Sequence, residues 1–130
     1  MKRRSYLKAM LAAGAAGTAA IAQEAKRSIV LDVDLSVDPA KEQEMLHHFH
    51  NTFKPAALKF PGYVDVKMCK LRSALQGSAA ADVNYRFQLT YLSEELRQKW
   101  VASDIHQKVW PLIENTLKSK NYTVLLFDSV

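Results

Sequence analysis

The chain has 130 residues, a length typical of one domain, and 48% of them are hydrophobic. Its single cysteine excludes a disulfide scaffold and a four-cysteine zinc site. The formal charge of +5 is concentrated at the start, since the first 22 residues hold four basic side chains and no acid. The other 108 residues carry 14 basic and 13 acidic side chains, a net charge of +1. Because a nucleic-acid-binding domain needs a basic surface, we expect no nucleic-acid partner.

Residues 1–22 have the three parts of an export signal. A basic start is followed by an uncharged, mildly apolar stretch over residues 9–21, which is too short and too rich in Ala and Gly for a stable membrane span. The run that begins at Arg3 and Arg4 (RRSYLK) resembles the twin-arginine consensus, which implies a periplasmic protein exported by the twin-arginine translocase. We expect cleavage between Ala22 and Gln23, which leaves residues 23–130 as the mature domain. An amphipathic helix or an uncleaved anchor is the alternative.

The first half of the domain predicts a strand, a helix and a second strand. Apolar residues alternate with polar ones over residues 28–36, as in a half-buried strand. Asp38 and Pro39 then suit the start of a helix, whose apolar stripe continues to residue 57. We expect Pro55 to end or kink this helix and Pro61-Gly62 to turn the chain into a strand over residues 63–71.

The second half predicts a strand, a broken helix and a last strand. Residues 82–92 show the clearest alternation in the chain. Ser93 suits a helix cap, Asp104 is expected to interrupt and recap the helix, and Pro111 is expected to kink the continuation. Residues 121–128 form the last strand.

The order β-α-β-β-α-β predicts an α+β, ferredoxin-like fold with a four-stranded antiparallel sheet and both helices on one face. The other face would carry Asp32, Asp34, Arg86 and Gln88. Two interpretations stay open: this face is solvated, or a second sheet packs on it and Asp32 and Asp34 pair with Arg86 across the two sheets.

The segment YLSEELRQKWVASDIHQ, residues 91–107, resembles the dimeric α/β-barrel proteins, in which the third strand leads into a Ser-Glu-Glu helix start and a later helix break. The turn FPGYV at residues 60–64 resembles their Pro-Gly-Phe turn before the second strand. Members include antibiotic-biosynthesis-type monooxygenases, haem-degrading monooxygenases and stress-responsive barrel proteins. The resemblance implies a homodimer whose sheets meet, here through the face with Asp32, Asp34, Arg86 and Gln88, and a small pocket between sheet and helices.

The chemistry of this group agrees with the chain only in part. Haem-degrading members resemble it at Trp100, but their first-strand Asn is absent from LDVDL at residues 31–35, and Trp110 stands where they have a later His. Cofactor-free members oxidise phenols or quinols with the substrate's own electrons, which implies a monooxygenase-like protein without a bound cofactor. The alternative is a non-enzymatic periplasmic subunit that binds a small molecule.

Candidate site residues come from the helices and the third strand. His106 could act as a general base toward a phenol, or brace the helix break by bonding a carbonyl or Asp104. His47 and His48 suit a solvated helix face, and with no converging third ligand we expect no metal. We expect the small-molecule pocket to be lined by Phe49, His50, Tyr85, Trp100, His106 and Trp110.

Overall fold

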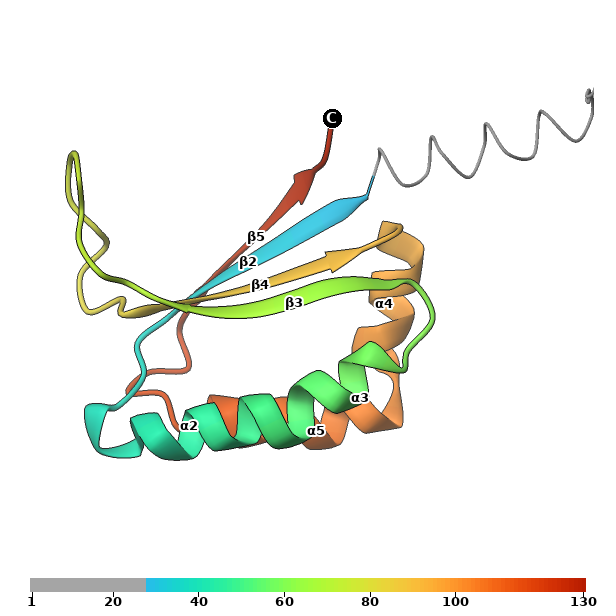
Figure 1. Ribbon diagram of the computed structural model, residues 1–130, viewed down its shortest axis with the longest axis horizontal. Coiled ribbons are helices and arrows are strands. Elements are labelled where there is room, and N and C mark those ends of the chain that lie inside the picture. Colours follow the sequence, from blue (N-terminus) through green and yellow to red (C-terminus); the bar gives the residue numbers. More distant parts are fainter. Residues whose placement is uncertain (1–27) are drawn as a thin grey trace, which may run out of the picture. The chain divides into compact units, whose positions relative to one another are not determined.

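The computed structural model describes residues 28–130. The export signal with Arg3 and Arg4, and its expected cleavage between Ala22 and Gln23, lie outside the described residues. Among the described residues, every helix is too short or too polar to cross a bilayer. In chain order the elements are β2 (Ile29–Leu35), a 3-10 turn (Pro39–Lys41), α2 (Glu42–His48), a π-helical turn (Phe49–Phe53), α3 (Lys54–Leu58), β3 (Tyr63–Lys70), β4 (Tyr85–Tyr91), α4 (Glu94–Ala102), α5 (Asp104–Glu114) and β5 (Thr123–Asp128) (Figure 1).

The four strands form one antiparallel sheet in the order β3-β4-β2-β5, which confirms the predicted α+β, ferredoxin-like fold. The central strand β4 pairs with both β2 and β3, so that Phe87 lies opposite Val33 on one side and opposite Met68 on the other. The helices lie over one face of the sheet (Figure 1). The core forms between that face and the helices, and its largest fully buried side chains are Trp100, Tyr91, Phe49, Phe53, Leu35 and Met45.

The first helical stretch begins as predicted and continues past its proline. Asp38 caps it, because its side chain accepts a hydrogen bond of 2.9 Å from the Ala40 backbone N–H. Pro55 neither ends nor breaks it, since the helix continues to Leu58. Before the proline the helix widens into a π-turn, in which the Lys54 N–H bonds the Phe49 carbonyl. The wide turn leaves room for a residue that has no N–H to donate, and Pro55 falls in the first turn of α3.

The second helical stretch is broken where the sequence predicted, but Ser103 and not Asp104 makes the cap. Ser103 has an extended backbone with φ −72° and ψ 152°. Its hydroxyl donates to the Trp100 carbonyl at 2.6 Å and accepts from the His106 N–H at 3.2 Å. Ser103 therefore ends α4 and starts α5, and Pro111 lies inside α5.

The third and last strands are shorter than predicted. Asp82 has φ +64° and belongs to a turn, so β4 begins only at Tyr85. Asn84 just before it uses its side-chain amide to bond both backbone groups of Val37, at 2.8 and 2.9 Å. The last strand begins at Thr123 rather than at residue 121. Asn84 still bonds β2 through its backbone N–H, which donates to the Leu35 carbonyl at 3.0 Å.

Candidate functional site

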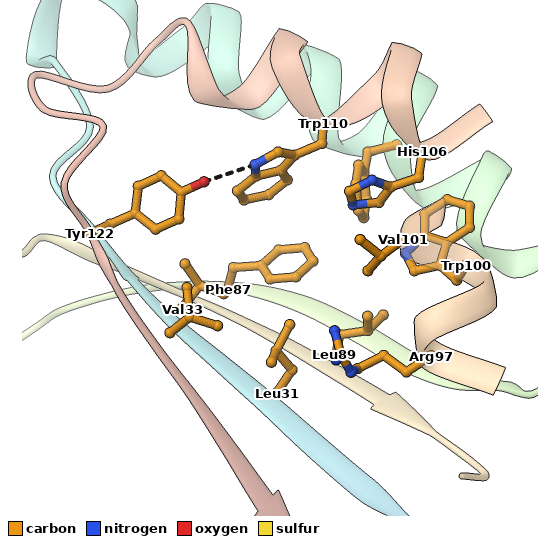
Figure 2. Close-up of a pocket in the computed structure, with 12 residues that line it drawn as sticks. Leu31, Val33, Phe87, Leu89, Arg97, Trp100, Val101, His106, Trp110 and Tyr122 are labelled. Carbon is orange, nitrogen blue, oxygen red and sulfur yellow. Dashed lines mark hydrogen bonds between the residues drawn. The ribbon is translucent and has the colours of Figure 1, made fainter. Parts of the chain in front are cut away.

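A cavity of about 160 Å³ lies between the sheet and the helices α4 and α5. Strands β2 and β4 supply one wall, α4 supplies an end, and α5 supplies the opposite wall with His106 and Trp110 (Figure 2). Nearly all of the surface is aliphatic or aromatic, as expected of a small-molecule site. The lining residues are Leu31, Val33, Phe53, Phe87, Leu89, Arg97, Trp100, Val101, His106, Trp110, Tyr122 and Val124.

The break at Ser103 brings the aromatic side chains of the two helices together. The rings of Trp100 and His106 meet edge to face with centroids 5.1 Å apart. His106 and Trp110, one turn apart on α5, are nearly parallel at 11° with centroids at 6.4 Å. Trp110 also meets Phe87 of β4 at 5.3 Å. A continuous helix would place Trp100 and His106 on different faces, because residues six apart differ by most of two turns.

Hydrogen bonds hold the indole of Trp110 in place. Its Nε1–H donates to the Tyr122 hydroxyl at 3.0 Å (Figure 2). That hydroxyl donates to the Glu114 carboxylate at 2.8 Å. Burial, and then the Glu114 carboxylate, raise the pKa of Tyr122 above its usual value. The hydroxyl therefore stays protonated near neutral pH, and both its proton and a lone pair are used within the protein.

His106 lines the cavity and has a buried, unused ring nitrogen. Its Nδ1 is buried and has no hydrogen-bond partner among the described residues. Burial first, and the Arg97 charge second, lower the pKa of His106 below its ordinary value of 6.5. The imidazole is therefore neutral near pH 7. The predicted bracing bond from His106 to a carbonyl or to Asp104 is not formed at Nδ1, and Ser103 holds the break instead.

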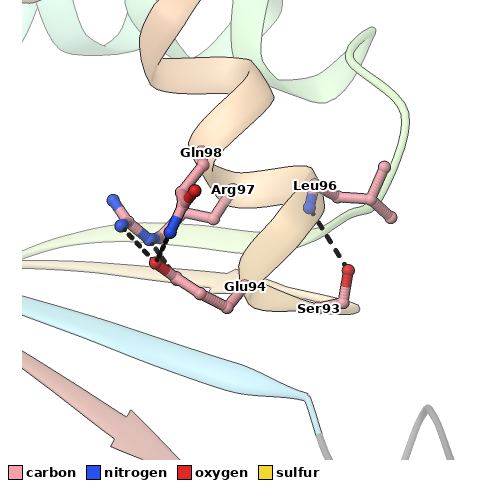
Figure 3. A network of polar contacts seen from close by, with 5 residues as sticks. All are labelled: Ser93, Glu94, Leu96, Arg97 and Gln98. Atoms are coloured by element: carbon pink, nitrogen blue, oxygen red, sulfur yellow. Dashed lines mark hydrogen bonds and ion pairs between the residues drawn. The ribbon is translucent and has the colours of Figure 1, made fainter.

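Arg97 is a site residue that the sequence analysis missed. Its Nε and Nη2 bond the two oxygens of Glu94 at 2.6 and 2.7 Å, and Gln98 adds a third bond to Glu94 at 2.9 Å (Figure 3). A Glu–Arg pair three residues apart at a helix start is typical of a solvated surface. The signal that could have found it is the spacing to Trp100, since residues three apart share a helix face.

The structure brings together three of the predicted pocket residues, Trp100, His106 and Trp110, and places the others elsewhere. Phe49 is buried in the core beside Phe53 and Phe87, not at the cavity. The prediction for His50 is wrong: its side chain is exposed, because Phe49 and Phe53 take the inner face of the π-turn.

Tyr85 also lies outside the cavity. Its hydroxyl donates to the Glu42 carboxylate at 2.5 Å, and burial together with this bond raises the pKa of Tyr85 to about 12. It therefore ties the start of the first helix to the sheet.

The polar residues of the open sheet face pair with each other within the chain. Asp32 lies directly opposite Gln88 and accepts its amide at 3.0 Å. Asp34 lies opposite Arg86 and accepts from its Nε at 2.9 Å. The charges on this face are thus matched inside one chain, which lowers the cost of covering it.

The histidines of the first helix point to separate partners. The ring of His47 lies 3.1 Å from the Asn51 side-chain amide, and His48 lies 3.7 Å from the Glu44 carboxylate. In the part of the chain that the structure describes, no three His, Cys, Asp or Glu side chains converge as metal ligands.

No family model and no curated protein matches this sequence. Solved structures do match, at low sequence identity. A Caulobacter crescentus protein described provisionally as an antibiotic biosynthesis monooxygenase shares 18% identity over 82% of this chain and 92% of its own, with a TM-score of 0.64. A dimeric ferredoxin-like protein of unknown function from Jannaschia shares 15% identity over 78% of this chain and 96% of its own, with a TM-score of 0.61. A conserved protein from Methanosarcina mazei shares 16% identity over 82% and 97%, with a TM-score of 0.64. At these identities the likeness shows the fold alone.

Proposed function

We propose that the cavity oxidises a small phenol or quinol with molecular oxygen and without a bound cofactor. The observation that carries this proposal is the neutral His106, which lines an aromatic cavity and whose buried Nδ1 has no partner among the described residues. A base for a phenol must lie within hydrogen-bond reach of the phenolic proton and be unprotonated at the working pH. His106 meets the second condition because burial lowers its pKa.

The reaction needs only the substrate, oxygen and a proton acceptor. The substrate hydroxyl donates to Nδ1 of His106, and transfer of this proton leaves an electron-rich phenolate. With hydroquinone as the substrate, one molecule of hydroquinone and one of molecular oxygen give one molecule of hydroxybenzoquinone and one of water. Oxygen accepts four electrons from the ring, one oxygen atom joins a ring carbon and the other leaves as water. Trp100, Trp110 and Phe87 line the part of the cavity that would surround the oxidised ring.

The size of the cavity favours one aromatic ring. An apolar cavity of about 150 Å³ holds one benzene molecule. The cavity here, at about 160 Å³, therefore suits a single-ring phenol better than a polycyclic one.

Oxygen uptake tests the proposal. With the purified domain and hydroquinone at pH 7, we expect uptake above spontaneous oxidation, and we expect His106→Ala to abolish this increment. His50→Ala is the matched control, because this histidine is exposed and outside the cavity. Quenching of tryptophan fluorescence by a phenol without oxygen uptake would instead support the non-enzymatic binding protein.

We also propose a homodimer formed through the open sheet face. Four apolar residues of the edge strand β5, residues 124–127, are each between 46% and 50% exposed. Val124 lines the cavity on the helix side, so Leu125 and Phe127 fall on the open face, on the strand next to Asp32 and Asp34. A row of apolar side chains on an edge strand is a liability unless a partner covers it. The Jannaschia structure is described as dimeric, which supports a dimer of this fold.

Light scattering at micromolar concentration tests the dimer. We expect twice the chain mass for the mature protein and a monomer for Leu125→Lys. Lys99→Glu, a charge change on α4 away from this face, is the control and should stay dimeric. A monomeric wild-type protein would overturn the proposal.

The export route is proposed from the sequence of residues 1–22 alone. We expect periplasmic protein to begin at Gln23, and we expect the double change Arg3→Lys and Arg4→Lys to block export. Normal export of that variant would refute a twin-arginine route.

A further inference from the structure

The lining of the cavity carries charge of one sign only. Of the residues that line it, Arg97 alone carries a charge near neutral pH, and no acidic side chain is among them. We propose that the aromatic ligand bears a carboxylate that binds Arg97, which makes the hydroxybenzoates its chemical class. This inference rests on the proposed function, whose site it specifies further.

Arg97 has N–H groups left for a ligand. A guanidinium carries five N–H donors, and Glu94 takes one from Nε and one from Nη2. Nη1 makes no hydrogen bond among the described residues. In Figure 2 the side chain of Arg97 extends from α4 along the sheet wall toward Leu31 and Leu89, with its guanidinium at the end of the cavity. A carboxylate at this end would accept from two parallel N–H groups, the geometry that Arg binds most strongly.

Glu94 pairs with Arg97 through both carboxylate oxygens but does not line the cavity, so only the guanidinium of the two charged groups borders it. The field of Arg97 reaches the cavity, because it contributes to lowering the pKa of His106. An anion inside the cavity would therefore be attracted to Arg97, because water screens the attraction between two charges least where it is excluded.

The opposite end of the cavity offers nothing to an anion. The Tyr122 hydroxyl donates to Glu114 and accepts from Trp110, so its proton is used. The Glu114 carboxylate behind it would repel a second carboxylate. The ligand is therefore oriented, with its carboxylate toward Arg97 and its ring against the touching rings of Phe87 and Trp110. A ring hydroxyl then remains for the unused Nδ1 of His106.

The test compares 4-hydroxybenzoate with 4-hydroxybenzamide, which has the same shape and no charge at pH 7. Calorimetry with the full mature protein should show the acid binding at least about tenfold more tightly than the amide, as expected for a bond to a charged group. Arg97→Gln should remove this preference and leave the affinity for the amide within about twofold. Thermal melting of each variant checks that the domain is folded.

Glu94→Gln separates ligand binding from a structural role. It breaks the same ion pair as Arg97→Gln but leaves the guanidinium uncompensated, so the acid should bind more tightly than to wild type. If the pair only stabilises α4, the two variants will behave alike, and the inference is wrong.

The two proposals fail in different ways. Equal affinity of wild type for the acid and the amide would overturn the carboxylate inference and leave the oxidation of neutral phenols standing. If neither of these two compounds nor hydroquinone binds, both the carboxylate inference and the proposed function are wrong.

Discussion

Gly62 makes the turn from α3 into β3 and lies directly against α4, which carries three of the cavity residues. Its φ of +94° is a conformation that side chains other than glycine rarely adopt. A Cβ added there would lie 2.7 Å from Cδ1 and 2.8 Å from Cβ of Leu96. The Gly62 carbonyl also accepts a hydrogen bond of 2.8 Å from the Leu92 N–H, so the turn cannot shift without loss.

The cost of Gly62→Ala is the sum of two effects. The left-handed backbone costs an alanine about 1–2 kcal/mol. Overpacking against Leu96 adds about 1–3 kcal/mol, because the backbone-attached Cβ of Leu96 cannot rotate away. Gly77 provides the matched control: its φ is +71°, but an added Cβ would meet nothing within 4 Å. Gly77→Ala should therefore cost only the about 1–2 kcal/mol of backbone strain.

Urea unfolding of both variants measures the difference. We expect Gly62→Ala to lower the free energy of unfolding by about 1–3 kcal/mol more than Gly77→Ala. It should also weaken ligand binding by the folded protein, because relief of the clash moves α4 and with it Arg97 and Trp100. An equal loss in the two variants would refute the argument that Leu96 packs closely on this turn.

The remaining predictions concern buried polar groups. Because the pKa of His106 is lowered on folding, its unfolded form binds more protons, so stability should fall as the pH drops from 6.5 toward the folded-state value. Urea unfolding at pH 7 and 5 should show that His106→Gln removes this part of the pH dependence, whereas His50→Gln retains it. Tyr122→Phe should lower the free energy of unfolding by about 1 kcal/mol, since Trp110 loses its acceptor, with thermal melting as the measurement. Tyr91→Phe is its counterpart and should be neutral or stabilising, because the buried Tyr91 hydroxyl has no partner among the described residues.

The alternation of apolar residues was sufficient to predict the fold. The strand at residues 85–91 buries alternate residues as the period of two indicates, and the strand at residues 29–35 buries Ile29, Val33 and Leu35 of the expected face together with Asp32. The caps at Asp38 and Ser93 are formed by the side chains that the sequence suggested. These features depend on neighbours a few residues away, which is why they can be found without a structure.

The errors arose where contacts come from distant residues. Asn84 continues an alternating pattern, yet its side chain bonds Val37, 47 residues earlier, and β4 starts only after it. His50 follows an apolar stripe at helical spacing, but the π-turn before Pro55 changes the face that points inward. Neither the length of a turn nor a partner so far along the chain can be seen in a local pattern.

The sequence indicated where the cavity lies but not that a charged side chain lines it. Large side chains beside a predicted helix break indicated Trp100, His106 and Trp110, and the structure brings these three together. Arg97 was missed because its pairing with Glu94 satisfies a surface pattern completely. Whether the arginine also faces a cavity depends on how α4 is rotated against the sheet, which the turn at Gly62 and the break at Ser103 decide.

The uncovered strand β5 connects the cavity with the proposed assembly. Val124 lines the cavity, yet it is half exposed, as are its neighbours on β5. A second copy that covers Leu125 and Phe127 on the open face would hold β5 against β2, and so fix the wall that Val124 and Tyr122 contribute. Ligand affinity should then depend on protein concentration in the range where the dimer forms, because linked equilibria stabilise each other. If Leu125→Lys gives a folded monomer that binds 4-hydroxybenzoate as tightly as the wild type, the cavity is complete in one chain and the two equilibria are independent.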